Sequence, residues 1–312
     1  MQWDDRIGRR LRLKDLHTLQ TVAAVGSMAK ASERLALSQP AISKAISDME
    51  QTLGAPLFDR SSVGVELTEC GRMLVARTRV IFDEVRQGAL DIEHLSDPTR
   101  GEVRIGTIEP LTGVVSEIIS RSARNYPRIS YHVTVSDADT LERELRERAL
   151  DVLIARWVAP VVADDLAAEV LFKSPLAVMA ERRHPLVRRK NLSLADLMGE
   201  RWTLSPPDSF LGRMVVDLFR RRKLLLPPSV VTTVSIYMRL NLLATGGFLT
   251  VLPLTMLQHR SNKTWLRALD IDLRDSASPI AAITLKKRQS GGAVQLFRQA
   301  SLEVCKETIG TR

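Results

Sequence analysis

The stretch from Ser27 to Leu53 constrains the fold of this chain more than any other. In its first part, Met28, Ala31 and Leu35 recur at helical spacing, which predicts a short helix with one apolar face. Ser27 precedes this helix and can act as its N-cap, because a side-chain oxygen can accept a hydrogen bond from a backbone N–H that the first turn leaves free. A tight corner at residues 36–37 then leads into a second helix.

Ser38 is the candidate cap of the second helix, and Pro40 lies in its first turn, where the N–H that proline lacks would have no partner. The apolar residues of this helix share one face, and the side chains at its N-terminus and on the other face are polar: Gln39, Ser43, Lys44 and Ser47. This pattern fits an ordinary helical hairpin with a solvated face. It also fits a helix-turn-helix, whose second helix enters the DNA major groove.

Several short motifs favour the second interpretation. Residues 31–35 read Ala-Ser-Glu-Arg-Leu, residues 37–43 read Leu-Ser-Gln-Pro-Ala-Ile-Ser, and residues 56–60 read Pro-Leu-Phe-Asp-Arg. With Leu-Gly at 53–54 and Leu-Thr-Glu-Cys-Gly at 67–71, these motifs resemble the signature of LysR-type transcriptional regulators. The match is dense over the first sixty-odd residues, and it implies a DNA-binding domain.

The side chains of this domain suggest separate roles in DNA contact. The Gln39 amide can pair with adenine, and the Ser43 hydroxyl can reach a base edge or a phosphate. Lys44 and Arg34 are expected to contact phosphates, which position a protein without reading sequence. Residues 56–67 predict a hairpin, the wing of a winged helix-turn-helix. The complete predicted set is Arg34, Ser38, Gln39, Pro40, Ser43, Lys44, Ser47 and Arg60, although Arg60 could equally pair with Asp59 or Glu66.

A long helix is predicted from residue 69 to residue 95, with Thr68 as its N-cap. Seven positions alternate in steps of four and three, as in the seam of a coiled coil: Leu74, Thr78, Ile81, Val85, Gly88, Ile92 and Leu95. The stripe could instead pack on the chain's own C-terminal domain. LysR-type proteins dimerise through this helix, so the resemblance implies a homodimer, and family resemblance further suggests a tetramer. A two-fold pair of reading helices predicts promoter DNA with inverted-repeat half-sites.

From Gly101 onward, strands alternate with helices, which predicts a parallel sheet with crossover helices. The expected strands of the first series lie at 103–106, 129–135 and 152–155, and the helices at 112–126 and 141–149. A second series has strands at 176–180, near 202, and at 230–233 and 249–252, before a return strand at 279–285 and a last helix at 293–305. The order resembles the two-lobed, periplasmic-binding-protein-like sensor of LysR-type regulators.

The expected fold class is therefore α+β and α/β, in three parts. We expect a winged helix-turn-helix DNA-binding domain at 1–68, a linker and dimerisation helix at 69–98, and an effector-binding domain at 99–312. Lobe I of the effector-binding domain would cover about 101–173 and 277–312, and lobe II about 174–276.

In such a fold, a small-molecule effector lies between the lobes, at the carboxyl ends of strands and the N-termini of helices. Nine residues fall at these positions: Thr107, Glu109, Thr112, Ser136, Arg156, Ser205, Ser209, Arg213 and Ser235. Arg156 and free backbone amides suit a carboxylate, whereas Glu109 suits hydroxyls or an amine. Each of these residues could instead be a helix cap or a surface group. The setting of Arg156 and Ser205 resembles regulators of sugar uptake and aromatic-acid catabolism.

Net charge contributes little to the DNA prediction. The chain carries a formal net charge of +9, but residues 1–68 hold nine Lys/Arg and eight Asp/Glu, a net charge of +1. The basic runs at 182–183, 188–190, 220–223 and 286–288 are better interpreted as solvated helix ends and loops. The prediction of DNA binding therefore depends on the helix-turn-helix.

Other classes of protein are disfavoured. The two cysteines are far apart, which argues against a disulfide framework or a zinc site and fits a reducing cytoplasm. The resemblance to LysR-type regulators implies that this is the cytoplasm of a bacterium, where the protein would associate with the nucleoid. No apolar run is long enough to span a membrane. The motifs of nucleotide-binding loops, serine hydrolases and zinc proteases do not occur, so we expect no enzyme, cofactor or metal. A plain solute-binding protein would leave the first hundred residues unexplained.

Overall fold

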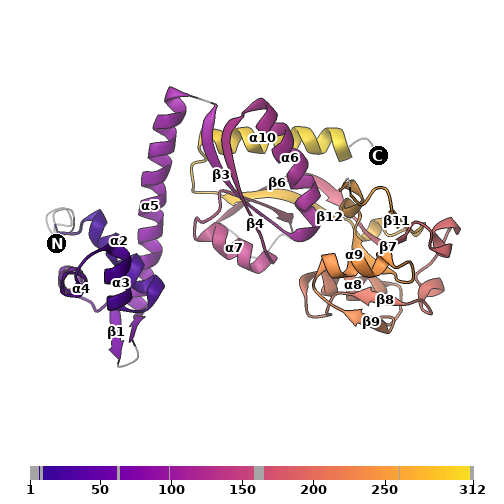
Figure 1. Cartoon of the computed structure of the whole chain (residues 1–312), viewed down its shortest axis with the longest axis horizontal. Helices are drawn as coiled ribbons and strands as arrows, with labels where there is room; N and C mark the ends of the chain where they lie inside the picture. Colours follow the sequence, from indigo (N-terminus) through magenta and orange to yellow (C-terminus); the bar gives the residue numbers. More distant parts are fainter. Residues whose placement is uncertain are drawn as a thin grey trace. The chain divides into compact units, whose positions relative to one another are not determined.

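The computed structural model describes residue 7 and residues 10–61, 64–97, 99–157, 165–259 and 261–309 (Figure 1). The chain divides into two compact units, Met1–Ala89 and Leu90–Arg312, and each is described by itself.

The N-terminal unit is a winged helix-turn-helix. Its helices are α2 (Leu13–Val25), α3 (Met28–Leu35) and α4 (Gln39–Leu53), and its wing is an antiparallel hairpin of β1 (Phe58–Ser61) and β2 (Gly64–Leu67). The apolar residues predicted for the inner faces form one core, which includes Leu19, Val22, Ala31, Ile42, Ile46, Met49, Leu57 and Phe58. The predicted fold of this part is confirmed.

The caps of α3 and α4 are those that the sequence predicts. Ser27 Oγ accepts a hydrogen bond from Lys30 N at 3.4 Å, and Ser38 Oγ accepts one from Ala41 N at 3.3 Å. Between the helices, Ala36 adopts the left-handed conformation at φ 52°, which produces the tight corner. These local interactions explain why the turn and both helix starts can be recognised from sequence.

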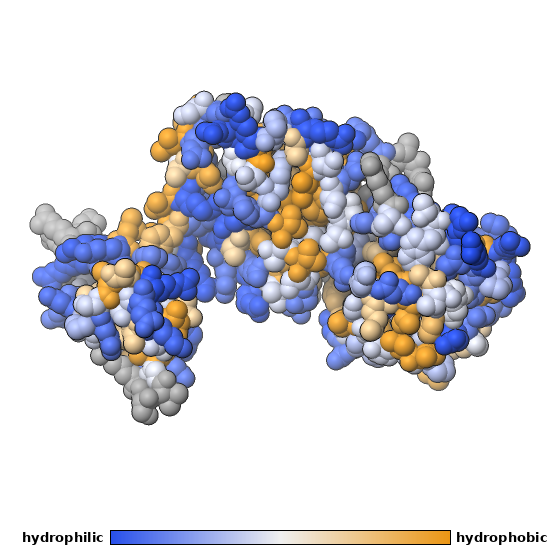
Figure 2. All heavy atoms as spheres, viewed as in Figure 1, coloured by the Kyte–Doolittle hydropathy of each residue, from blue (hydrophilic) through white to orange (hydrophobic). Residues whose placement is uncertain are grey.

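The long helix α5 runs from Glu69 to Ser96. Thr68 Oγ1 accepts a hydrogen bond from Gly71 N at 3.0 Å, which confirms the predicted cap. Two of the seven predicted seam positions are not open in the single chain, because Leu74 packs against the core of the N-terminal unit and Thr78 is fully buried. Further along α5, Val85 is 53% exposed and Leu95 is 85% exposed. Figure 2 shows apolar side chains at the surface of this helix.

Lobe I of the C-terminal unit contains a five-stranded sheet in the order β4-β3-β5-β12-β6. Its strands are β3 (Arg100–Thr107), β4 (Arg128–Val135), β5 (Val152–Arg156), β6 (Leu166–Ser174) and β12 (Ser278–Leu285). The first three are parallel, but β12 is antiparallel to both β5 and β6. The expected parallel sheet is therefore a mixed one, because β12 returns from lobe II and enters between two existing strands. The sequence analysis did not predict β6.

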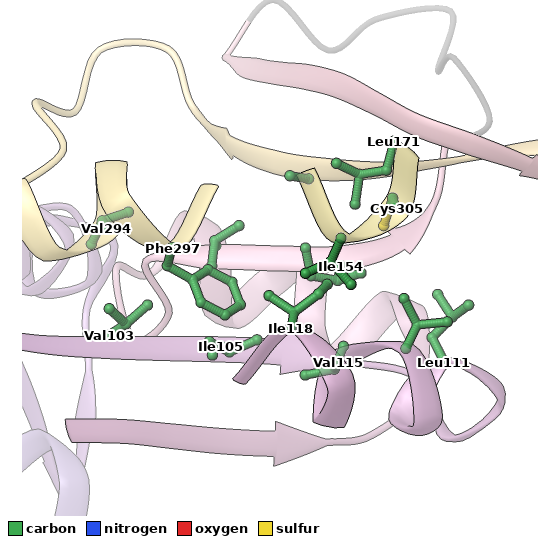
Figure 3. Close-up of a cluster of buried hydrophobic side chains, with 14 of the residues drawn as sticks. Val103, Ile105, Leu111, Val115, Ile118, Ile154, Leu171, Val294, Phe297 and Cys305 are labelled. Carbon is green, nitrogen blue, oxygen red and sulfur yellow. The ribbon is translucent and has the colours of Figure 1, made fainter. Parts of the chain in front are cut away.

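Helices cover both faces of this sheet. On one face, α6 (Thr112–Asn125) and α10 (Gly292–Ile309) pack on the strands, and Phe297, Ile118 and Ile105 meet in the core (Figure 3). On the other face lies α7 (Ala138–Arg146), which ends three residues before the predicted position. The buried thiol of Cys305 belongs to the first core, and burial raises its pKa to about 12.

In lobe II, β7 (Leu176–Glu181) pairs antiparallel with β10 (Thr250–Pro253) and β11 (Leu266–Ala268), and β8 (Trp202–Leu204) pairs parallel with β9 (Ser229–Thr232). The helices of this lobe are α8 (Phe210–Arg221) and α9 (Ile236–Ala244). Short 3-10 helices occur in the unit at η1 (Glu109–Leu111), η2 (Pro185–Arg188), η3 (Ala195–Leu197), η4 (Leu254–Gln258) and η5 (Arg274–Ser276). The chain crosses between the lobes after β6 and before β12, close to the predicted positions.

No helix in the described part of the chain has the length and apolar content that a membrane span needs. The same residues contain no group of three or more His, Cys, Asp or Glu side chains that could hold a metal ion.

Candidate nucleic-acid interface and ligand pockets

The outer face of α4 is polar and open to solvent. Gln39, Lys44 and Ser47 are exposed and Ser43 is partly exposed, whereas Ile46 on the opposite face is fully buried. Three further predicted residues are also exposed: Arg34 near the end of α3, Ser38 before α4 and Pro40 in its first turn. Arg60 belongs to β1, but its side chain lies outside the described residues. A helix that is buried on its apolar side and presents polar side chains on the other has the shape and chemistry to enter a DNA groove.

The wing is fixed to the helices by contacts that the sequence analysis missed. Glu50 Oε1, near the C-terminal end of α4, accepts hydrogen bonds from Leu57 N at 2.8 Å and Phe58 N at 3.3 Å. On the other strand of the wing, Val65 N donates to Gly26 O at 3.2 Å. These bonds connect both strands of the wing to the helical part of the unit. No sequence signal distinguishes Glu50 from an ordinary solvent-facing carboxylate.

Two of the nine predicted effector residues, Arg156 and Arg213, meet in one pocket, which we call the hinge pocket. Its volume is about 340 Å³, and it lies where the chain crosses between the lobes. The lining residues are Arg156, Leu176, Phe210, Arg213, Met214, Asp217, Leu218, Arg221, Asp275, Ser276, Ala277 and Ser278. Arg156 ends β5 in lobe I, and Arg213 lies on α8 in lobe II. The pocket therefore joins side chains from both lobes.

Arg156 is the most deeply buried charged group in the hinge pocket. Only 9% of the residue is exposed, and burial lowers its pKa to about 10. Its guanidinium donates to Ser174 O at 3.3 Å, and no carboxylate of the described chain pairs with it. A buried guanidinium without an anionic partner is costly, and its high pKa keeps it charged.

A second pocket contains Glu109 and Thr112, and we call it the α9 pocket. Its volume is about 440 Å³, and its other walls come from α9 and the segment after η4, including Ile236, Tyr237, Leu240 and Trp265. The Thr112 hydroxyl donates to Glu109 O at 2.9 Å. Of the residues predicted to line one cleft, Arg156 and Arg213 therefore line the hinge pocket, whereas Glu109 and Thr112 line the α9 pocket.

The remaining predicted effector residues lie outside both pockets. Thr107 is buried and donates to Ile154 O at 3.0 Å, and Ser136 Oγ donates to Asp137 Oδ2 at 3.4 Å. Ser209 caps α8 and Ser235 caps α9. Ser205 is buried at the end of β8. The sequence left a helix cap open as the alternative role of these residues, and Ser209 and Ser235 form such caps in the structure.

Arg239 is a charged residue that the sequence analysis overlooked. It lies on α9, fully buried, and donates long hydrogen bonds to Thr250 Oγ1 at 3.4 Å and Val251 O at 3.5 Å. Burial lowers its pKa to about 10, and the negative charge of Glu109 acts in the opposite direction. The only sequence feature that could have indicated this burial is that Arg239 is a lone charged residue in the largely apolar helix at 236–244.

Comparison with known proteins identifies both units. The family profile "Bacterial regulatory helix-turn-helix protein, lysR family" matches residues 13–72, and the profile "LysR substrate binding domain" matches residues 96–306. The HTH-type transcriptional regulator GbpR of Azospirillum brasilense is 28% identical over 281 residues, covering 89% of this chain and 82% of that protein. The uncharacterised HTH-type regulator YnfL of Escherichia coli is 29% identical, covering 92% and 97%.

Solved structures share the whole architecture. A full-length OxyR variant from Pseudomonas aeruginosa has a TM-score of 0.67 at 19% identity, covering 95% of each chain. Full-length CbnR in complex with its target DNA also has a TM-score of 0.67, at 20% identity, covering 94% of this chain and 100% of that one. At these identities the likeness concerns the fold alone. The two profiles establish that this chain is a member of the LysR family, a DNA-binding transcriptional regulator with an effector-binding domain rather than an enzyme.

Proposed function

We propose that the exposed face of α4 reads base pairs in the major groove, with Gln39 and Ser43 on base edges and Lys44 on a phosphate. The observation that carries this proposal is the division of α4 into a fully buried apolar side and an open polar side. The capped N-terminus of α4 adds support, because a helix N-terminus attracts the negative charge of a phosphate. The resolved contacts of Glu50 keep the wing beside this surface.

The first prediction tests the reading helix. Gln39→Ala and Ser43→Ala are each expected to weaken binding to the specific site by about 10- to 100-fold, because each loses a contact that discriminates bases by about 1–3 kcal/mol. Lys44→Ala should weaken binding to all sequences alike and lower the salt slope by about one. Titration of labelled promoter fragments and of unrelated duplex measures both effects.

Gln51→Ala is the matched control for this experiment. It removes the same amide from the same helix, at an exposed position three turns further along. Specific binding should stay at the wild-type level in this variant. Two results would exclude α4 as the reading helix. One is an equal loss of specific affinity in Gln39→Ala and Gln51→Ala, and the other is unchanged specific affinity in both Gln39→Ala and Ser43→Ala.

We also propose that two chains pair through the open part of α5, which presents two reading helices to inverted half-sites. Ile81, Val85, Ile92 and Leu95 support this, since they are apolar, exposed in the single chain and separated by steps of four and three or their sum. Further association into a tetramer is part of the same proposal.

The second prediction concerns this pairing. Val85→Glu is expected to shift the protein toward the monomer, because two carboxylates would be desolvated at the centre of the seam. Met73→Glu, on the same helix but outside the seam, serves as the control, and Met73 is 66% exposed. Native mass at matched concentrations measures the outcome. A Val85→Glu protein with the wild-type mass would refute the proposed interface.

A small-molecule effector bound between the lobes is the remaining part of the proposed function. Binding can alter DNA contact only if the effector prefers one arrangement of lobes or subunits over another. The hinge pocket supports this role better than the α9 pocket, because two predicted residues from different lobes line it and one of them is a buried cation with no anionic partner among the described residues.

A further inference from the structure

We infer that the hinge pocket binds a small dianion, either a dicarboxylate or a phosphate monoester, that bridges the two lobes. This inference rests on the proposed effector function and assigns the chemical class of the ligand. It begins from three guanidinium groups, those of Arg156, Arg213 and Arg221, which line a single pocket.

None of these three arginines pairs with a carboxylate in the described part of the chain. The Arg156 guanidinium donates to Ser174 O, that of Arg213 to Asp208 O and that of Arg221 to Asp275 O, all of which are backbone carbonyls. Carbonyl groups are neutral, so these hydrogen bonds bring no counter-charge, and among the carboxylates that line the pocket the charge of Arg221 acts on Asp275 and helps to lower its pKa.

Two carboxylates also line the pocket, but arginines outside its lining pair with both of them. Asp217 Oδ1 lies 2.6 Å from Arg220 Nη2, and Asp275 Oδ1 lies 2.8 Å from Arg222 Nη2. The hydrogen bond from Arg222 also holds the pKa of Asp275 below its ordinary value, so this group is ionised and engaged. Because Arg220 and Arg222 balance the charges of these two aspartates, the pocket as a whole remains positively charged.

The positions of the three arginines indicate the charge of the ligand, and the volume of the pocket indicates its size. Arg156 belongs to lobe I, whereas Arg213 and Arg221 are eight residues apart on α8 of lobe II. Because planar guanidinium groups bind carboxylate and phosphate oxygens through paired hydrogen bonds, a ligand that engages both lobes needs at least two negative charges. A volume of about 340 Å³ is near the lower limit for ligand sites, which favours a small molecule. Phe210 and Met214 provide an apolar wall for its carbon atoms.

The third prediction is that full-length protein binds succinate or glycerol 3-phosphate in a phosphate-free buffer. Either probe should raise the melting temperature, because a ligand that binds only the native state stabilises it. Butyrate and glucose, which carry one charge and none, should not. A shift with succinate alone assigns the dicarboxylate, and a shift with glycerol 3-phosphate alone assigns the phosphate monoester. No shift with either dianion, or an equal shift with butyrate, overturns the inference.

Substitutions locate the site. Arg156→Gln and Arg221→Gln should each raise the dissociation constant of the active probe at least about tenfold, which is the effect of losing one charge-assisted contact. Arg124→Gln makes the same charge change at an exposed position of α6 outside the pocket and should leave affinity unchanged.

Melting temperatures without ligand verify that each variant folds. Because Arg221 is exposed, Arg221→Gln keeps the test valid if Arg156→Gln fails to fold. Equal affinity in wild type and Arg221→Gln overturns the site. Promoter binding by Gln39→Ala is measured separately, so failure of the reading helix and failure of this site are distinguishable.

Discussion

Replacing Gly71 with alanine is expected to lower the free energy of unfolding of the N-terminal unit by about 3 kcal/mol or more. A Cβ atom at this position would lie 2.0 Å from Leu57 O and 2.9 Å from Leu67 Cδ2. Leu57 O cannot easily move away, because it accepts a hydrogen bond from Thr68 N at 3.0 Å. The added methyl group therefore separates the start of α5 from the base of the wing, and DNA binding should fall together with stability.

Cys70→Ala is the control for this prediction. Cys70 is the neighbouring residue on α5 and is exposed, so its replacement should change stability little. Chemical denaturation monitored by circular dichroism measures the stabilities, and promoter titration measures the functional consequence. A Gly71→Ala protein with wild-type stability would mean that α5 does not approach the wing as closely as these distances indicate.

The sequence predicted best the features that depend on local interactions. The corner at Ala36, the caps at Ser27, Ser38 and Thr68, and the apolar face of α4 each depend on residues within one or two helical turns. Such patterns can be read along the chain because the partner atoms are close in sequence. The lobes and their crossing points were also predicted, although there the family resemblance supplied the order of elements.

The features that were missed depend on residues far apart in sequence. The place of β12 between β5 and β6 is set by pairing across more than one hundred residues, so alternation of strands and helices predicted a parallel sheet instead.

The pockets also depend on residues that are far apart in the sequence. Nothing near Arg221 in the sequence indicates that it shares a pocket with Arg156, and nothing near Arg239 indicates that it is fully buried. A serine that caps a helix has the same sequence position as one that binds a ligand, so the sequence could not separate these two roles at Ser209 and Ser235.

The second large effect is expected from Asp151→Asn in lobe I. The Asp151 side chain is 2% exposed and lies between two arginines, with Arg104 Nη2 at 2.8 Å and Arg288 Nη2 at 2.7 Å. Arg104 N also donates to Asp151 Oδ2 at 2.8 Å. An amide has nearly the same shape but no charge, so the variant removes the negative charge that both guanidinium groups contact. Breaking a buried ion pair in this way costs about 3–5 kcal/mol, and denaturation at pH 7 should show a loss in that range.

The pH dependence of this loss identifies its cause. Burial alone would raise the pKa of Asp151, but the hydrogen bonds and charge of Arg104 and the charge of Arg288 outweigh burial and hold the pKa below its ordinary value. A carboxylate with a lowered native pKa stabilises the protein at neutral pH, and this contribution disappears as the pH falls through the native pKa. The stability difference between wild type and Asp151→Asn should therefore be largest near neutral pH and shrink in acid. Asp272→Asn removes an exposed carboxylate paired with Arg274 and should have little effect at any pH. A difference that stays constant down to strongly acidic pH would show that the amide disturbs packing rather than charge.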